Sequence, residues 1–145
     1  MQAAAIPSTS MASVTAVIVT FRPDLSALHA QLARLRPQVA QAVIVDNASG
    51  TEVAADLQAL AHTFKARLLR NRSNLGIAAA LNQGIAAARA LGATHVLMMD
   101  QDSLPAADMV EKLLAALARL QSQETVAAVG PVAEDLRTGE AAPFV

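Results

Sequence analysis

Two carboxylates stand two residues apart, at Asp100 and Asp102, where the apolar run THVLMMD gives way to polar residues. If that run is a buried strand, both side chains can face one hard cation at its carboxyl end. Mg²⁺ and Mn²⁺ prefer oxygen ligands and are often held by one or two carboxylates plus substrate phosphates. The spacing therefore predicts a metal site that neutralises a departing diphosphate. Alternatively, Asp102 and Ser103 only begin the helix entered at Pro105.

Two other segments carry polar groups after apolar runs. Asp46 follows AVIV, and its carboxylate could accept the N3–H of a uracil or thymine ring, although Asp-Asn-x-Ser-Gly is also a favoured turn. Asn74 and Gly76 open a predicted helix, where free N–H groups attract phosphate or polar bases. Simple capping by Asn74 is the alternative there. Taken alone, neither segment decides the chemistry.

The remaining reactive residue types offer no second site. There is no cysteine, which excludes thiolate metal ligands, thiol nucleophiles and disulfides. The histidines His29, His62 and His95 lack metal-ligand spacing and are interpreted as structural. The late acids Glu134, Asp135 and Glu140 fall in a turn-like tail. The adjacent methionines Met98 and Met99 are predicted to be strand core.

Strands and helices in alternation must position the candidate groups. Apolar runs typical of buried parallel strands occupy 14–20, 42–46, 66–70, 94–100 and 125–130. Between them lie four helical stripes, of which the third is Ile77, Leu81, Ile85 and Ala88. This order predicts an α/β fold, a mostly parallel sheet with helices on both faces. Ligands then bind beyond the carboxyl ends of the strands, where the polar segments are.

Composition limits the partners and the domain count. The chain has 145 residues, 54% of them hydrophobic, and a net charge of −1. These values predict one domain with a sizeable core and give no basic field for nucleic acid. No apolar run approaches the ~20 residues of a membrane-spanning helix, and residues 1–13 lack the pattern of a secretory signal. We predict a flexible leader at 1–13, the ligand-binding part at 14–131 and a tail at 132–145.

Four motifs in order resemble the family 2 nucleotide-sugar glycosyltransferases with the GT-A fold. They are TAVIVTFRPD, VIVDNAS, RNRSNLGIAAALNQGI and HVLMMDQDS. The sequence looks most like bacterial rhamnosyltransferases of polysaccharide assembly, and the resemblance covers about residues 14–131. It implies a truncated GT-A fold, a Rossmann-like nucleotide-diphospho-sugar transferase, that holds only the donor-binding half.

The resemblance also implies a role for each matching position. Thr20 and Phe21 would line the base, and Asp46 would hydrogen-bond it. Asn74 to Gly76 would flank the nucleotide, with Asn82 further along the same helix. Asp100 would face the ribose or the metal, and Asp102 would bind Mg²⁺ or Mn²⁺. The reaction would invert the anomeric carbon as an acceptor hydroxyl displaces the nucleoside diphosphate.

The family's acceptor site and catalytic base belong to a later half, so we expect no catalytic base in this chain and place it beyond Val145. The expected donor is a dTDP- or UDP-linked sugar, with rhamnose as a candidate, and the acceptor is a glycan or lipid-linked glycan. The expected location is cytoplasmic, with peripheral contact to the inner membrane through the missing part.

Rival functions fit less well. A response-regulator receiver domain needs an acidic pair after the first strand, where Thr20, Phe21 and Arg22 stand, and a late lysine, where Gly130 stands. A dinucleotide-binding oxidoreductase needs a glycine-rich turn after the first strand, and a phosphate-gripping nucleotidase needs Gly-Lys-Ser/Thr. Both patterns are absent. A non-catalytic nucleotide-sugar-binding module would share every motif and stays an alternative.

Overall fold

The structure is a computed structural model that describes residues 12–135 and 137–141. The chain divides into two compact units, residues 1–104 and 105–145. Residues 1–11 of the predicted leader lie outside the described residues. The first unit contains every element that positions the candidate site, and the second contains helix α4 (Met109–Gln121).

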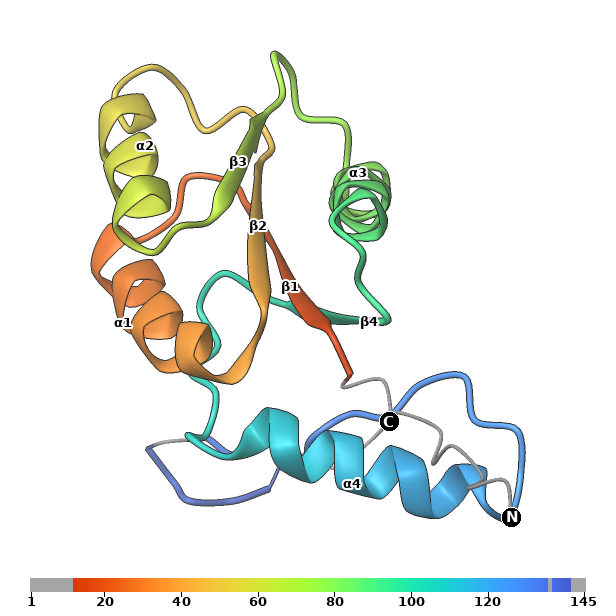
Figure 1. The fold of residues 1–145 in the computed structure, drawn as a ribbon. Helices are drawn as coiled ribbons and strands as arrows, with labels where there is room; N and C mark the ends of the chain where they lie inside the picture. Colours follow the sequence, from red (N-terminus) through yellow and green to blue (C-terminus); the bar gives the residue numbers. More distant parts are fainter. Residues whose placement is uncertain (1–11, 136, 142–145) are drawn as a thin grey trace. The chain divides into compact units, whose positions relative to one another are not determined.

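The first unit alternates strands and helices as predicted (Figure 1). Its strands are β1 (Val14–Thr20), β2 (Gln41–Asp46), β3 (Arg67–Arg70) and β4 (His95–Met99). Its helices are α1 (Leu25–Leu35), the short 3₁₀ helix η1 (Arg36–Gln38), α2 (Ala54–Thr63) and α3 (Ile77–Ala90). The expectation of an α/β fold with a parallel sheet and helices on both faces is confirmed: α1 and α2 lie on one side of the sheet and α3 on the other.

The four strands are parallel in the order β3-β2-β1-β4. In this register Thr20 pairs with Asp46 and Asp46 pairs with Arg70, while Met99 pairs with Ile18 of β1. The carboxyl ends of all four strands therefore meet at one edge. Every residue of β1 is buried, as expected for a central parallel strand.

Helix α3 packs on the sheet through small side chains, and the predicted stripe for this helix is confirmed only in part. Its buried residues are Ala80, Gly84, Ala87 and Ala88, of which the stripe named only Ala88. Leu81 packs against the core while partly buried, whereas Ile77 is 60% exposed. Spacing alone favoured the larger side chains. The small residues win because they let the helix backbone approach Val17 and Val45 of the sheet closely.

The predicted fifth strand at 125–130 is also wrong, since the structure has no strand there. An apolar run forms a strand only where a neighbouring edge takes its backbone hydrogen bonds. The described part of the second unit contains no strand. Its only β pairing is an isolated antiparallel bridge between Glu134 and Ala141.

Asp24 caps helix α1, which covers the sheet and reaches the candidate site. Its Oδ1 accepts hydrogen bonds from the Ser26 hydroxyl at 2.7 Å and from the backbone N–H groups of Ser26 and Ala27 at 2.8 and 3.1 Å. The Ser26 hydroxyl, followed by these N–H groups, lowers the pKa of Asp24 below its usual value. The ionised side chain therefore stabilises the folded state.

We expect Asp24→Ala to lower the melting temperature at pH 7. Because the folded-state pKa is depressed, the Asp24 contribution is present above the unfolded pKa of about 3.9 and is lost as pH falls through the lowered folded value. Thermal unfolding of both proteins between pH 7 and pH 2 should therefore show the difference shrinking. Asp24→Asn keeps a good cap, so it should retain more stability at pH 7 than the alanine variant. A difference independent of pH would contradict this account.

Candidate functional site

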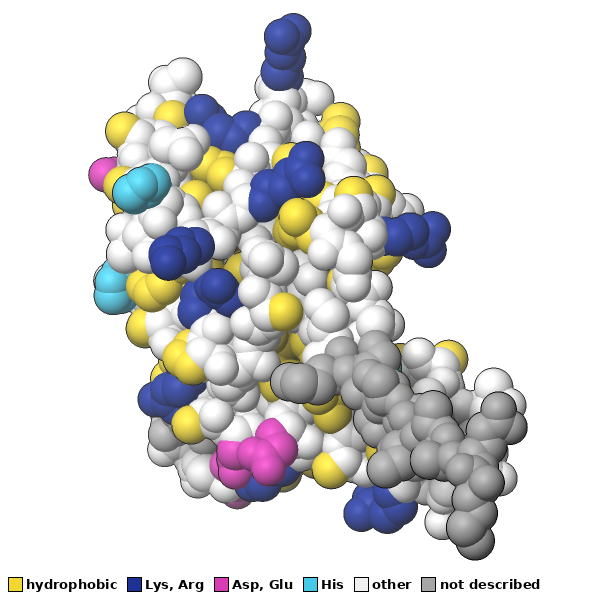
Figure 2. All heavy atoms as spheres, viewed as in Figure 1, with side chains coloured by type: hydrophobic (Ala, Val, Ile, Leu, Met, Phe, Trp, Pro, Cys, Tyr) yellow, Lys and Arg dark blue, Asp and Glu magenta, His cyan; other side chains and the backbone are white. Residues whose placement is uncertain are grey.

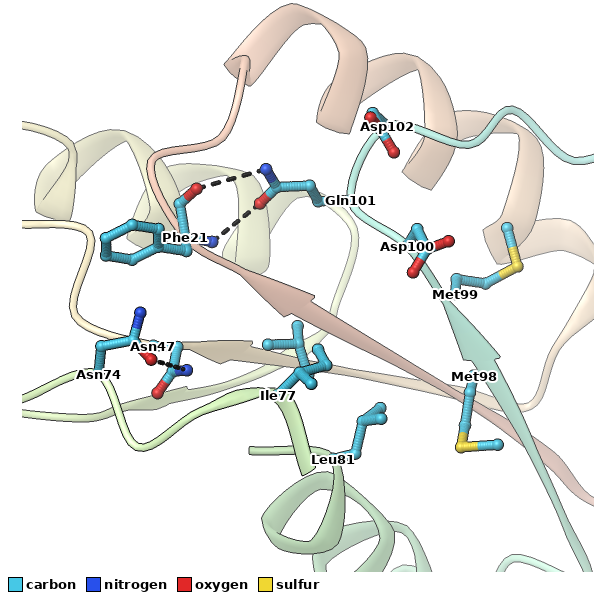
Figure 3. A pocket seen from close by; sticks show the side chains of 11 residues that line it. Phe21, Asn47, Asn74, Ile77, Leu81, Met98, Met99, Asp100, Gln101 and Asp102 are labelled. Carbon is cyan, nitrogen blue, oxygen red and sulfur yellow. Dashed lines mark hydrogen bonds between the residues drawn. The ribbon is translucent and has the colours of Figure 1, made fainter. Parts of the chain in front are cut away.

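A pocket of about 520 Å³ opens at the carboxyl edge of the sheet (Figure 3). Its walls come from β1, the loop after β2, the start of α3, and β4 with the loop that follows. The lining residues are Val19, Phe21, Asn47, Asn74, Ile77, Leu81, Met98, Met99, Asp100, Gln101 and Asp102. The pocket thus lies where the topology of a parallel sheet predicts ligand binding.

The two predicted metal ligands both line this pocket. Asp100 and Asp102 follow β4 on one loop, and both are exposed (Figure 3). No group of three or more His, Cys, Asp or Glu residues that could hold a metal occurs among the described residues. Two carboxylates suit a hard cation whose coordination is completed by substrate phosphates and water, so the donor set fits Mg²⁺ or Mn²⁺ bound together with a diphosphate.

The residue between the carboxylates ties their loop to β1. The Gln101 side chain accepts a hydrogen bond from the Phe21 N–H at 2.8 Å and donates one to the Phe21 carbonyl at 3.3 Å (Figure 3). This pair of bonds extends the contact between the β1 and β4 ends beyond the last strand pairing. It also fixes Phe21, which is 40% exposed and forms one wall of the pocket.

Arg22, which follows Phe21, is held by the loop after β2. Arg22 has a left-handed backbone with φ of 49°, and its N–H donates to the Ser49 hydroxyl at 2.8 Å. Its guanidinium lies 5.2 Å from the centre of the Phe21 ring, within cation–π range. The Phe21–Arg22 turn is therefore held by the loops after β2 and β4.

Asp46 lies at the same edge but outside the pocket lining, and it is fully buried. Its carboxylate accepts hydrogen bonds from the Ser49 N–H and hydroxyl and from the Thr20 hydroxyl, and it pairs with Arg70 Nε at 3.4 Å. A buried carboxylate needs such partners. In this structure Asp46 joins the ends of β1, β2 and β3, and Thr20 is equally buried.

Asn47 organises the loop before α3. Its amide nitrogen donates to Asn74 Oδ1 at 2.8 Å and to the Gly76 carbonyl at 3.3 Å. Its oxygen accepts from the Asn71 amide at 3.1 Å and from the Leu75 N–H at 3.0 Å. Gly76 has φ of 82°, which favours glycine, and stands as the N-cap of α3. Asn74 therefore reaches the pocket through a loop held by one buried amide.

The structure brings together four of the predicted site residues and separates the others from the pocket surface. Phe21, Asn74, Asp100 and Asp102 line the pocket, whereas Thr20, Asp46 and Gly76 do not. The exposed Asn82 is not among the lining residues either.

Met98 was predicted to be strand core, and that prediction is wrong. It is 56% exposed and lines the pocket together with Met99. The apolar run indicated burial on both faces, but β4 is an edge strand of the sheet. The sequence reasoning also missed Asn47, Ile77 and Leu81 as lining residues. Only the position of Asn47 beside Asp46 carried a local signal.

A family comparison identifies the chain. The profile described as "Glycosyl transferase family 2" matches residues 15–139. The chain belongs to glycosyl transferase family 2. A curated family relative, the "dTDP-rhamnosyl transferase RfbF" of Shigella flexneri, is 35% identical over 101 residues, which cover 70% of this chain and 33% of the relative. The chain thus spans about a third of the length of that relative.

Solved structures agree with a GT-A glycosyltransferase fold, of which this chain matches a part. A mannosyltransferase from Pyrobaculum calidifontis, in complex with GDP-Man and Mn²⁺, superposes with a TM-score of 0.57 at 27% identity, covering 72% of this chain and 32% of its own. The glucosyl-3-phosphoglycerate synthase of Mycobacterium tuberculosis, in complex with Mn²⁺, UDP and glucosyl-3-phosphoglycerate, gives 0.55 at 18% identity, covering 74% of this chain and 40% of its own. At that lower identity the second comparison supports the fold alone.

Two further features concern the helices and the charged side chains of the described residues. Among the helices in the described part of the chain, none has the length and apolar character to cross a membrane. The Lys and Arg side chains on the face in Figure 2 are spread out and do not gather in one field.

Proposed function

We propose that this chain binds the nucleoside diphosphate sugar donor of an inverting glycosyltransferase, together with Mg²⁺ or Mn²⁺. The observation that carries the proposal is the pocket at the sheet edge, which Asp100 and Asp102 line together with Phe21 and Asn74. It combines two hard-cation ligands with an aromatic wall and an amide side chain. Family membership and the GDP-Man and Mn²⁺ complex of the similar mannosyltransferase support this function.

Each wall of the pocket has a part in donor binding. Asp102 and Asp100 would hold the cation, which when bound would neutralise charge on the departing diphosphate. Phe21 offers its ring to the base, and the side chain of Asn74 can hydrogen-bond the nucleotide. Asp46, Thr20 and Gly76 shape the loops that carry these groups, and direct contact of Asp46 with the base would require a partner exchange at its carboxylate.

The finer assignments follow the rhamnosyltransferase relative. The proposed donor is dTDP-linked, with UDP-linked sugars as the competing class, and rhamnose is the candidate sugar. The proposed acceptor is a glycan or lipid-linked glycan of polysaccharide biosynthesis. Residues 14–131 form the proposed donor-binding half. A cytoplasmic location, with peripheral membrane contact, belongs to the same proposal.

Isothermal titration calorimetry tests the proposal. dTDP and UDP are each titrated into the chain with Mn²⁺ and with EDTA. We expect dTDP to bind in Mn²⁺ at least about tenfold more tightly than in EDTA, because a cation held by Asp100 and Asp102 would offset the charge of the diphosphate. Thymidine, which has no phosphate, should show no Mn²⁺ effect. Equal dTDP affinities in Mn²⁺ and EDTA, or no nucleotide binding at all, would reject the function.

A further inference from the structure

Gln31 is a fully buried polar side chain that lies outside the pocket yet contacts the loop of the two carboxylates. It is on helix α1, among the buried leucines that cover the sheet. Its Nε2 donates one hydrogen bond to the Asp100 carbonyl at 2.5 Å and another to the Ser103 carbonyl at 2.6 Å. One amide therefore holds the main chain on both sides of Asp102.

These two bonds determine the shape of the loop. The carbonyl groups of residues 100 and 103 must both point at the same nitrogen, which restricts the backbone torsions between them. The Gln101 side chain binds Phe21 on the pocket side of the same loop (Figure 3). The loop is thus held from the interior by Gln31 and from β1 through Gln101.

Burying Gln31 costs stability, because one of its polar atoms is left without a hydrogen-bond partner in the described part of the chain. Its Oε1 has no hydrogen-bond partner among the described residues, although the side chain has no exposed surface. A methionine of similar length would fill the same space without burying an unpaired acceptor. What methionine could not provide is the pair of N–H donors for the loop carbonyls.

We propose that Gln31 is a positioning residue that sets the Asp100 and Asp102 carboxylates for divalent cation and diphosphate binding. The inference rests on the proposed donor-binding function. Mg²⁺ and Mn²⁺ sites depend on the placement of their oxygen ligands, and groups that orient ligands without touching the metal change metal affinity. Gln31 acts on the ligands through the main chain that carries them.

The test compares Gln31→Met with the wild-type chain by calorimetric titration of dTDP in Mn²⁺ and in EDTA. We expect the variant to lose about tenfold in dTDP affinity in Mn²⁺ and to change less than about twofold in EDTA. The ratio of the two affinities is the decisive readout, because general loosening of the fold would weaken both. Leu35→Val, on the same buried face of α1, is the matched control and should leave that ratio unchanged.

Different outcomes distinguish failure of the Gln31 positioning role from failure of the proposed donor-binding function. If wild type shows no Mn²⁺ effect on dTDP binding, the proposed function fails. If wild type shows the effect and Gln31→Met retains it within about twofold, the function stands and the positioning role is rejected. Should Gln31→Met not fold, the assigned Gln31 side-chain amide resonance of wild type is followed in ¹⁵N spectra. It should shift when Mg²⁺ is added to the dTDP-containing sample but not without dTDP, and an unmoved resonance overturns the inference.

Discussion

Asp102→Ala is expected to abolish the Mn²⁺-dependent part of nucleotide binding. Asp102 lines the pocket, and alanine would leave Asp100 as the single carboxylate on the loop after β4. With one of the two carboxylates removed the cation should be held more weakly, so dTDP affinity in Mn²⁺ should fall by at least about tenfold, to near the EDTA value. Calorimetry on folded protein, verified by circular dichroism, measures the change.

Two further variants make the Asp102 result specific. Asp102→Asn keeps the size of the side chain but removes its charge, and it should behave almost as the alanine variant does. Asp56→Ala removes an equally exposed carboxylate from α2, outside the pocket lining, and should bind dTDP like wild type. Undiminished Mn²⁺-dependent binding in Asp102→Ala would remove Asp102 from the metal site.

Gly84→Leu is expected to destabilise the protein strongly. Gly84 lies where α3 meets the sheet, and a Cβ there would overlap Val17 Cγ1 and lie 3.2 Å from Val45 Cγ2. Both valines belong to the core, so the helix must move outward. Overpacking costs about 1–3 kcal/mol or more, and the gain in helix propensity over glycine is only about 1 kcal/mol. We expect a leucine here to cost about 3 kcal/mol.

Urea unfolding of Gly84→Leu measures this cost. Ala86→Leu adds the same side chain at an exposed position of α3, and it should unfold at the wild-type urea concentration. Because α3 carries Ile77 and Leu81 to the pocket, any folded Gly84→Leu protein should also bind dTDP more weakly. A stability equal to that of Ala86→Leu would show that α3 does not pack closely at Gly84.

The strands and the carboxylate pair could be predicted because their signals are local. Continuous apolar runs identified β1 and β2, and the parallel topology then placed Asp100 and Asp102 at the ligand edge. Periodicity found Ala88 but missed Ala80 and Gly84 on the buried face of α3, because it weights apolar size, whereas close contact with Val17 requires a small residue. Met98 is exposed because β4 lies at the edge of the sheet. Its exposure could not be predicted, because local sequence does not show the order of the strands.

Hydrogen bonds between segments far apart in the chain could not be predicted either, because local sequence does not show which segments meet in the fold. Gln31 contacts residues 69 and 72 positions away along the chain, and no local pattern marks it. Asp46 could be recognised as a polar residue at a strand end, but its burial depends on Ser49, Thr20 and Arg70 all reaching one carboxylate. Such contacts exist only once the three strand ends have met.

The most direct test of the central claim is a crystal of the chain grown with Mn²⁺ and dTDP, with data collected at the manganese absorption edge. The account predicts one anomalous peak beside the Asp100 and Asp102 carboxylates of the loop after β4, with dTDP bound at the same site and its base against Phe21. A peak elsewhere, or dTDP bound away from both Asp100 and Asp102, would contradict it.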